Sequence, residues 1–520
     1  MTKYPVGIQT FAEIREGGYL YVDKTQYVHD LANNYKYIFL SRPRRFGKSL
    51  LTNTFNAYFS GRKELFEGLA IEGLETQWEE YPVLQFDLSV VKRGLIEELH
   101  DALDAQLTVY ENKYDCPQTA KGYGIRLKDL TERVFAKTQK KVVILIDEYD
   151  APILTVLGEE EKVSKIRSAL QSFYAPIKSL DPCLRFVFLT GITKFSQLSI
   201  FSQLNNLENI SMLNKFAGIC GITQDELETN FADGIKILSN KNSWSREETL
   251  ANLKRMYDGY HFSKSGIGTY NPFSLLRCMK DCELDQYWFA TGTPTFLVKQ
   301  LQYFKTDITR IDGSECEMEE FDAPTENLHS IIPLFYQSGY LTIKSYDKQF
   351  NVYTLGYPNE EVKIGVTRML IPYYVDSNTI DTGNACLRMC KALIKDDIDE
   401  ALTIVGRYIK SIPYQEGTLQ NAPTTEGHFT AMLYVIFSFL NRHVYSQIRM
   451  ATGRMDILIK TATTIFVMEL KLDGSAEEAL QQINNKGYAI PYDIDERKVV
   501  KVGVNFSTTE RTITEWKVEK

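Results

Sequence analysis

The sequence predicts an α/β protein with two separate sheet-containing regions, because three stretches combine short apolar runs with polar residues at their ends. Tyr37–Ser49 is an apolar run followed by a basic loop that ends in Gly-Lys-Ser. Lys141–Asp150 is an apolar run that ends in carboxylates, and Gly453–Lys471 holds two apolar runs that carry acids and a lysine. At 520 residues, the chain is long enough for several domains.

The first stretch has the order strand, loop, helix that is typical of a phosphate-binding P-loop. Tyr37–Leu40 is short and apolar, as a buried parallel strand is, and apolar residues recur at helical spacing after Ser49. In such a loop, backbone N–H groups bind phosphate, the lysine reaches the outer phosphates and the serine hydroxyl binds Mg²⁺. The residues expected to bind the nucleotide are Arg44, Arg45, Phe46, Gly47, Lys48, Ser49 and Leu50.

The loop departs from the usual pattern G-x-x-x-x-G-K-[ST] at its first position, where Arg42 replaces glycine. Arg42 and Pro43 restrict the backbone where the usual loop is loose. The three arginines either add phosphate contacts or bind something else, and a basic surface turn before a helix is the alternative to a nucleotide site.

The second stretch is expected to deliver acids to the same sheet edge. Asp147 and Glu148 follow a β-branched apolar run, and ligand sites of α/β sheets lie at the carboxyl ends of strands. Asp147 would hold Mg²⁺ and Glu148 would polarise the attacking water, unless the two form an ordinary acidic loop. Leu184–Gly191 is a third apolar strand. Thr190 near its end would sense the γ-phosphate or bond to the backbone.

We divide the chain into a P-loop domain (1–222), a helical lid (223–325), a winged-helix-like module (326–382), a helical connector (383–415) and a last domain (416–520). Residues 217–222 are expected to form a final short strand. Asp23–Thr25 either caps a helix or approaches the nucleotide. Asn271 and Pro272 begin a helix, and the alternative is that they also touch adenine. The winged-helix-like module would either touch DNA or pack against the P-loop domain.

The last domain carries a second set of chemical groups. Asp456 and Glu469 lie 13 residues apart on strands that can pair as a hairpin, and Lys471 shares a face with Glu469. Two carboxylates suit Mg²⁺, with Mn²⁺ as an alternative metal, and the lysine would orient water or a scissile phosphate. Glu426 would complete the metal shell, and Gln482 and Tyr488 follow on a helix. A surface hairpin that carries these residues by chance is the alternative.

Composition limits the classes of partner and location. The net charge of −8 argues against general coating of nucleic acid, but a local basic groove is compatible with it. The first residues lack the apolar core of a signal peptide, and no run approaches the 18 apolar residues of a membrane span. Eight cysteines in such a chain suggest reduced thiols, so we expect a cytoplasmic protein without a membrane anchor.

The chain resembles the bacterial AAA-ATPase-like proteins that carry a C-terminal PD-(D/E)XK nuclease domain. The arginine-rich loop is typical of that family, so Arg42 is not a defect of this chain. The resemblance rests on motifs along nearly the whole sequence: Tyr-Val-Asp-Lys-Thr (21–25), Arg-Pro-Arg-Arg-Phe-Gly-Lys-Ser (42–49), Asp-Glu-Tyr-Asp (147–150), Leu-Thr-Gly (189–191), Tyr-Asp-Gly-Tyr (257–260), Tyr-Asn-Pro-Phe (270–273), Tyr-Pro-Asn-Glu-Glu-Val (357–362), Gly-Arg-Met-Asp (453–456), Glu-Leu-Lys (469–471) and Gln482 with Tyr488.

The resemblance implies an ASCE-type P-loop core with Asp147 and Glu148 as its acids, and a restriction-endonuclease-like α/β domain with Asp456, Glu469 and Lys471 as its active-site set. We expect ATP and Mg²⁺ as cofactors, nucleic acid as a partner (DNA before RNA) and a homo-oligomer as a further expectation. ATP would control a nuclease that acts in defence against mobile DNA. The first alternative is a signalling switch of the AAA or STAND kind whose nuclease fold only binds nucleic acid or a partner. The second is an interaction protein in which ATP only stabilises a closed form.

Overall fold

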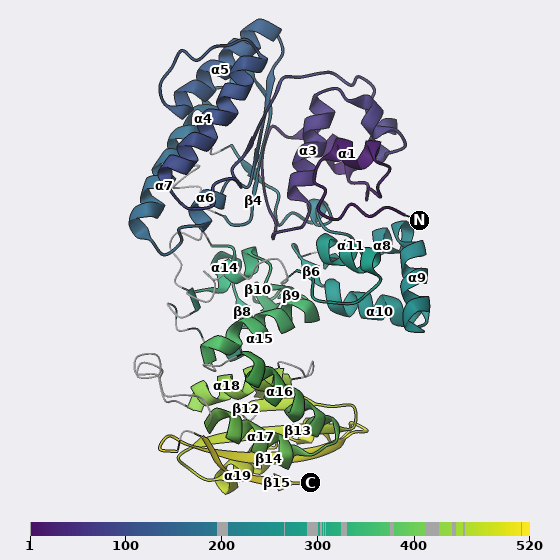
Figure 1. Ribbon diagram of the computed structural model, residues 1–520, viewed down its shortest axis with the longest axis vertical. Helices are drawn as coiled ribbons and strands as arrows, with labels where there is room; N and C mark the ends of the chain where they lie inside the picture. The colour runs from purple at the N-terminus through teal and green to yellow at the C-terminus, as the bar shows by residue number, and fades with distance from the viewer. Residues whose placement is uncertain are drawn as a thin grey trace. The chain divides into compact units, whose positions relative to one another are not determined.

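The computed structural model divides the chain into two compact units (Figure 1). The N-terminal unit comprises Met1–Thr291 and Glu315–Asn359, and the C-terminal unit comprises Gly292–Ser314 and Glu360–Lys520. The residues that the structure describes are 2–194, 206–264, 266–288, 300–301, 304, 306, 308–323, 330–374, 379–410, 426–438, 444–450, 453–510 and 512–520.

A parallel sheet with the order β2-β3-β4-β1-β5 forms the centre of the N-terminal unit. The strands predicted before the basic loop, before the acids and at Leu184–Gly191 are confirmed. The sheet consists of β1 (Tyr37–Ser41), β2 (Val83–Asp87), β3 (Val142–Asp147), β4 (Leu184–Gly191) and β5 (Glu208–Asn209). β4 lies between β1, which precedes the basic loop, and β3, which ends in the acids. This order confirms the α/β fold with a P-loop-like parallel sheet, and it brings the end of β4 to the centre of the site.

Helices cover both faces of this sheet, so its strands are almost completely buried (Figure 1). One face carries α1 and α3, and the other carries α4, α5 and α7. The bounds are α1 (Phe11–Glu16), α2 (Thr25–Asn34), α3 (Lys48–Phe59), α4 (Ile96–Lys113), α5 (Tyr123–Thr138), α6 (Ala151–Leu154) and α7 (Glu160–Tyr174). The strands are apolar at nearly every position because helices cover both faces of the parallel sheet, which therefore has no polar side.

The predicted lid is helical where the structure describes it. Its helices are α8 (Gln224–Asn230), α9 (Ala232–Asn242), α10 (Arg246–Tyr257) and α11 (Pro272–Asp281), with a short hairpin of β6 (Tyr260–His261) and β7 (Gly268–Thr269). Thr223 and Glu226, which have the Thr-x-x-Glu spacing of a capping box, form one at the start of α8. Residues 217–222 do not form the expected strand, because only Ile222 pairs, in an isolated bridge with Tyr270.

Residues 315–359 belong to the N-terminal unit and form the 315–359 module. It holds α13 (Met318–Phe321), α14 (Ile332–Gln337), β9 (Thr342–Asp347) and β10 (Val352–Gly356), and β8 (Ser314–Cys316) completes a sheet of order β8-β10-β9. The predicted helix–strand–turn–strand order is therefore present, while the winged-helix assignment stays a prediction. Leu334 to Gln337 of α14 are all buried in this unit, and contact of the module with DNA stays a prediction.

The C-terminal unit contains a five-stranded sheet of order β11-β12-β13-β14-β15, in which only β13 and β14 are parallel. Phe429 of α18 stacks on Phe506, whereas a Cβ at Gly503 would lie 2.2 Å from the carbonyl of Ala476 in α19, so these helices cover opposite faces. The elements are α15 (Glu360–Tyr374), α16 (Thr379–Ile394), α17 (Ile398–Lys410), α18 (Glu426–Ser438), β11 (Val444–Met450), β12 (Gly453–Lys460), β13 (Thr464–Leu472), α19 (Ala476–Lys486), β14 (Lys498–Ser507) and β15 (Thr512–Glu519).

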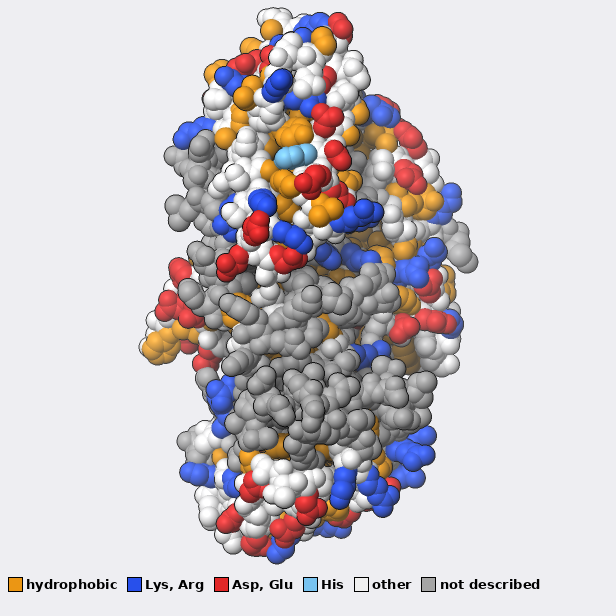
Figure 2. Space-filling model, turned by 60° about the vertical axis from the view of Figure 1, so that its left-hand side comes forward, with side chains coloured by type: hydrophobic (Ala, Val, Ile, Leu, Met, Phe, Trp, Pro, Cys, Tyr) orange, Lys and Arg blue, Asp and Glu red, His pale blue; other side chains and the backbone are white. Residues whose placement is uncertain are grey.

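The surface over α4, α5 and α7 carries charges of both signs. Figure 2 shows lysine and arginine side chains interspersed there with acids and with exposed apolar groups, rather than a single basic field. No helix in the part of the chain that the structure describes has the length and hydropathy of a membrane span. The five-part division of the chain stays a prediction, and residues 411–425 at its last boundary lie outside the described residues.

Candidate functional sites

The basic loop after β1 has the backbone shape of an anion-binding turn. Gly47 takes φ 88° and is the N-cap of α3, a conformation in which glycine is strongly favoured. The side chain of Lys48, the first residue of the helix, is buried and lies 3.2 Å from the carbonyl oxygen of Pro43. Its ammonium group also lies 3.2 Å from Glu148 Oε1. The lysine therefore lies at the N-terminus of α3 with a carboxylate as its counter-ion.

The acids after β3 face this lysine. Asp147 is buried, and burial together with the neighbouring Glu148 charge raises the pKa of its carboxyl group to about 6, against a hydrogen bond from Ser49 that lowers it. The structure therefore brings Lys48, Ser49, Asp147 and Glu148 together, as the sequence predicts. A buried carboxylate beside a serine hydroxyl at a helix N-terminus is an oxygen donor set that suits Mg²⁺.

Thr190 lies at the end of β4, between the loop strand and the acidic strand. Its backbone oxygen accepts a hydrogen bond from Tyr149 N at 3.0 Å. Its Oγ1 atom is buried and has no hydrogen-bond partner among the described residues, so the alternative of a hydroxyl bonded to the backbone is not what the structure shows. A buried donor without a partner costs free energy, and a bound phosphate oxygen would satisfy it.

Asp150 is a residue of this site that the sequence interpretation missed. Its carboxylate is fully buried and accepts hydrogen bonds from Ile192 N at 3.0 Å, Thr193 N at 2.6 Å and Thr193 Oγ1 at 2.7 Å. It therefore ties the loop after β3 to the loop after β4. A Cβ at Gly191 would meet Asp150 Oδ1 at 2.4 Å, which explains the glycine that follows Thr190. The repeated acid in Asp-Glu-Tyr-Asp was the available signal.

The residues before Gly47 divide between the protein interior and the surface. Arg42 is buried and donates to the carbonyl oxygens of Ser41, Ser211 and Phe216. Arg44 is exposed. The guanidinium of Arg45 stacks at 3.9 Å on the ring of Phe273, and Phe46 packs edge-on against Tyr260 at 4.7 Å and Phe262 at 5.4 Å. The nucleotide contacts predicted for Arg44, Arg45, Phe46 and Leu50 stay predictions.

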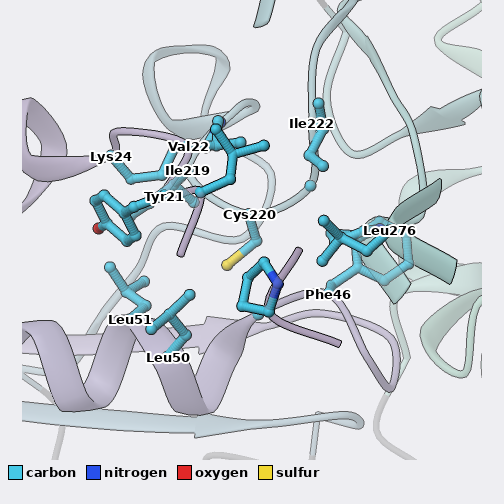
Figure 3. A pocket seen from close by; sticks show the side chains of 15 residues that line it. Tyr21, Val22, Lys24, Phe46, Leu50, Leu51, Ile219, Cys220, Ile222 and Leu276 are labelled. Atoms are coloured by element: carbon cyan, nitrogen blue, oxygen red, sulfur yellow. The ribbon is translucent and has the colours of Figure 1, made fainter. Parts of the chain in front are cut away.

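An apolar pocket opens beside the start of α3 (Figure 3). Val22, Leu50, Cys220, Pro272 and Leu276 are among the residues that line it, and Cys220 directs its sulfur toward the start of α3. Segments far apart in the sequence thus line one apolar pocket next to the phosphate loop. The expected strand at 217–222 instead provides a wall of this pocket.

Of the two alternatives for the lid turn, the helix start is confirmed, and contact with adenine stays a prediction. Asn271 is buried, and its Oδ1 atom accepts hydrogen bonds from Phe273 N and Ser274 N, so it caps α11. Pro272 lines the pocket. Similarly, Asp23 accepts from Thr25 N at 2.8 Å at the start of α2, while Lys24 lines the pocket with its ammonium 2.7 Å from Glu226 Oε2.

In the C-terminal unit, Asp456 and Glu469 meet where the hairpin of β12 and β13 ends. The register pairs Ile457 with Met468, so the next pair outward is Asp456 with Glu469. There the two carboxylates accept hydrogen bonds from backbone N–H groups. Asp456 Oδ2 accepts from Leu470 N at 3.0 Å, and Glu469 Oε2 accepts from Asp456 N at 3.4 Å. Both side chains are buried, which fixes two carboxylates side by side, a donor set that suits a divalent cation.

Lys471 and Gln482 extend this cluster. Lys471 Nζ donates to Gln482 Oε1 at 2.7 Å, and the amide group of Gln482 donates to Glu469. Tyr488 is buried, a Cβ at Gly453 would lie 2.6 Å from its hydroxyl oxygen, and burial with the nearby Glu469 charge raises the pKa of that hydroxyl. The side chain of Glu426 lies outside the described residues, so its predicted place in the metal shell stays a prediction.

Comparison with known proteins adds the family. A family model described as "Predicted AAA-ATPase" matches residues 5–201, and one described as "PD-(D/E)XK nuclease superfamily" matches residues 424–516. A protein of Azotobacter chroococcum mcd 1, named only as an uncharacterized protein in the vnfD 5' region, is 33% identical over 530 residues that cover 99% of each chain. This chain belongs to the family of AAA-ATPase-like proteins with a C-terminal PD-(D/E)XK nuclease domain.

Membership of the AAA-ATPase-like nuclease family confirms the resemblance seen in the motifs. The matched ranges contain the two clusters of side chains, since Lys48, Asp147 and Thr190 lie in the first range and Asp456 and Glu469 lie in the second. Both family types generally use divalent metals, and the first uses ATP. The carboxylates of both clusters fit that requirement through the chemistry of their oxygen donors.

Proposed function

We propose that this protein binds ATP with Mg²⁺ at the loop after β1 and that its nucleotide state controls metal-dependent hydrolysis of DNA in the C-terminal domain. The observation that carries the proposal is that each cluster forms within its own unit. Lys48, Ser49, Asp147, Glu148 and Thr190 converge in the N-terminal unit. Asp456, Glu469, Lys471 and Gln482 converge in the C-terminal unit.

In the N-terminal unit, Lys48 and the N–H groups at the start of α3 would hold the phosphates, and Ser49 and Asp147 would hold Mg²⁺. Glu148 would leave its ion pair with Lys48 when the γ-phosphate arrives and would then orient water. The apolar pocket beside α3 would take the adenine ring, with Pro272 and Leu50 against its faces. The thiol of Cys220 in the same pocket offers a direct probe of occupancy.

In the C-terminal unit, Asp456 and Glu469 would hold one Mg²⁺ or Mn²⁺ ion, which would activate water and stabilise charge on the scissile phosphate. Lys471 would donate to that phosphate or position the water, and Gln482 holds it near Glu469. The nuclease-family domain makes nucleic acid the expected partner. DNA is preferred within this proposal, with defence against mobile DNA as its setting, and a cytoplasmic homo-oligomer stays a prediction.

The test is cleavage of supercoiled plasmid, linear duplex and single-stranded DNA by the purified full chain with Mg²⁺ or Mn²⁺, with and without ATP. Glu469→Gln should abolish cleavage and keep ATP binding, whereas Glu496→Gln, at an exposed position, should keep both cleavage and ATP binding. Lys48→Met should weaken ATP binding and remove the effect of ATP on cleavage, whereas Lys63→Met, also at an exposed position, should not.

Three outcomes would revise the proposal. Cleavage that is lost in Glu469→Gln but is indifferent to ATP would separate the two sites. No cleavage of any substrate together with ATP binding would favour the switch whose nuclease fold only binds. Unchanged labelling of Cys220 by a thiol reagent upon addition of ATP, with no ATP binding by calorimetry, would refute the nucleotide site.

A further inference from the structure

The 315–359 module contacts the phosphate loop directly. Gly339 follows α14 with φ 86°, and a Cβ at this glycine would lie 2.6 Å from the Cβ atom of Pro43. Pro43 is the residue whose carbonyl oxygen accepts from Lys48. The end of α14 therefore lies against the backbone that would move when phosphate enters.

The module also holds the end of β4. The backbone N–H of Lys194 donates to Gln337 Oε1 at 2.7 Å, and the Lys194 ammonium forms an ion pair with Asp322. Gln337 completes the brace, since its amide donates to the carbonyl oxygen of Ala323 at 2.8 Å. Lys194 follows Thr190 by four residues along the chain. A shift at Thr190 thus reaches the module through a short stretch of backbone.

Each residue of that stretch is hydrogen-bonded to another part of the site. Gly191 O accepts from Arg42 N at 3.1 Å, while Ile192 and Thr193 donate to Asp150. These hydrogen bonds restrict how far the backbone of the segment can move within the site. A displacement at one end is passed on instead of being absorbed, because stretching several buried hydrogen bonds costs more than moving the segment as a body.

The last residues of the module, where the chain passes from the N-terminal to the C-terminal unit, make a further contact with the N-terminal unit. The side-chain amide of Asn359 donates to the carbonyl oxygen of Asp258 at 2.8 Å. A Cβ at Gly259 would lie 2.2 Å from the carbonyl oxygen of Pro358, so the two backbones are in close contact. The next residue, Tyr260, is the one that packs against Phe46 of the phosphate loop. Asn359 is the last residue of this unit, and Glu360 begins α15 of the C-terminal unit.

We propose that the 315–359 module is the transmission element between the nucleotide site and the nuclease domain. Its inputs are the Gly339 contact with Pro43 and the Gln337 and Asp322 contacts with Lys194. It would pass movement on through the contacts of Pro358 and Asn359 with the Asp258–Gly259 backbone. The inference rests on the proposed nucleotide site. It gives a mechanical role to the motifs Tyr-Asp-Gly-Tyr (257–260) and Tyr-Pro-Asn-Glu-Glu-Val (357–362), which place no reactive group in either site.

The experiment is hydrogen–deuterium exchange of the full chain, free and with Mg-ATP. If the inference holds, ATP slows exchange of peptides that cover 42–50 and changes exchange in both 332–347 and 357–370. Gln337→Met removes the brace on Lys194 at nearly constant volume and should reduce the ATP-dependent change in 332–347 and 357–370, while the Gly339 contact with Pro43 keeps part of it. Asn359→Ala should abolish it in 357–370 alone. ATP affinity should stay within about twofold of wild type in both variants, where a tenfold change is worth 1.4 kcal/mol.

Gln349→Met at an exposed position of the same module is the matched control and should respond like wild type. Circular dichroism melting of each variant shows whether it is folded, and the double variant Lys194→Met/Asp322→Leu replaces Gln337→Met if that variant unfolds. Protection of 42–50 without a change in 332–347 and 357–370 would overturn the inference and leave the nucleotide site standing. An absence of protection at 42–50 would overturn the proposed nucleotide function itself.

Discussion

Thr190 gives the sharpest test of the nucleotide site, because its replacement by valine should have opposite effects on the free and the ATP-bound protein. The Oγ1 atom is buried and has no hydrogen-bond partner among the described residues. Valine has nearly the same shape and removes only the hydroxyl group. In the nucleotide-free protein, the substitution therefore removes a hydroxyl group that is buried away from water and makes no hydrogen bond to compensate.

The sizes follow from these surroundings. An unpaired buried hydroxyl costs about 1–3 kcal/mol, so Thr190→Val should raise the local unfolding free energy of β4 by about 1 kcal/mol without nucleotide. A hydrogen bond to a charged phosphate oxygen contributes about 1.5–3 kcal/mol. If Thr190 contacts the γ-phosphate, the variant should bind ATP about 10- to 150-fold more weakly. ADP lacks that phosphate, so its affinity should stay unchanged.

Thr193→Val is the matched control on the same segment. Thr193 is equally buried, but its Oγ1 atom donates to Asp150 at 2.7 Å, so its loss should destabilise β4 by about 1.5–3 kcal/mol. Hydrogen exchange of β4 amides measures both effects without interference from the C-terminal unit, and calorimetry gives the ATP and ADP affinities. Destabilisation of the free protein by Thr190→Val, or equal loss of ATP and ADP affinity, would refute the role given to this hydroxyl.

Three further predictions concern other residues. The raised pKa of Asp147, about 6, means that a proton competes with Mg²⁺ below that pH, so calorimetric Mg-dependent ATP affinity should fall by nearly tenfold per pH unit below 6 and stay constant from pH 7 to 8. Gln482→Met should reduce the rate of DNA cleavage by about 10- to 100-fold with little change in melting temperature, because it releases Lys471 from Glu469. Arg42→Met leaves buried carbonyl groups without donors and should lower the unfolding free energy in urea by about 3 kcal/mol, and Arg42→Lys should not restore it.

Local signals in the sequence were sufficient for β1, β3 and β4 of the central sheet and for the acids at its edge, but not for the two-residue strand β5. The strand β3 is apolar at every position before Asp147 because it is covered on both sides, and that pattern is visible without a structure. The cap of α11 at Asn271 and the capping box of α8 were equally local. Asp456 and Glu469 could be paired because strand periodicity and a short turn leave few registers open.

Contacts between distant segments could not be read in the same way. Arg42 looked like a candidate phosphate ligand by its place in the loop, but its guanidinium is committed to carbonyl groups near residue 216. Phe46 has the same ambiguity, since its ring packs on Tyr260, more than two hundred residues later. Residues 217–222 are apolar because they line a pocket and a core, and composition alone does not separate that case from a strand.

The family motifs therefore fall into two physical kinds. Gly-Lys-Ser, Asp-Glu and Glu-Leu-Lys place charged groups where a phosphate or a metal is expected. Tyr-Asp-Gly-Tyr and Tyr-Pro-Asn-Glu-Glu-Val place no reactive group in either site, yet Gly259 and Asn359 of these motifs hold the exit of the N-terminal unit against the residue that supports Phe46. An enzyme whose two sites worked independently would have no reason to anchor its junction to the phosphate loop. The placement of this second kind of motif is the physical argument for the proposed coupling of nucleotide state to nuclease activity.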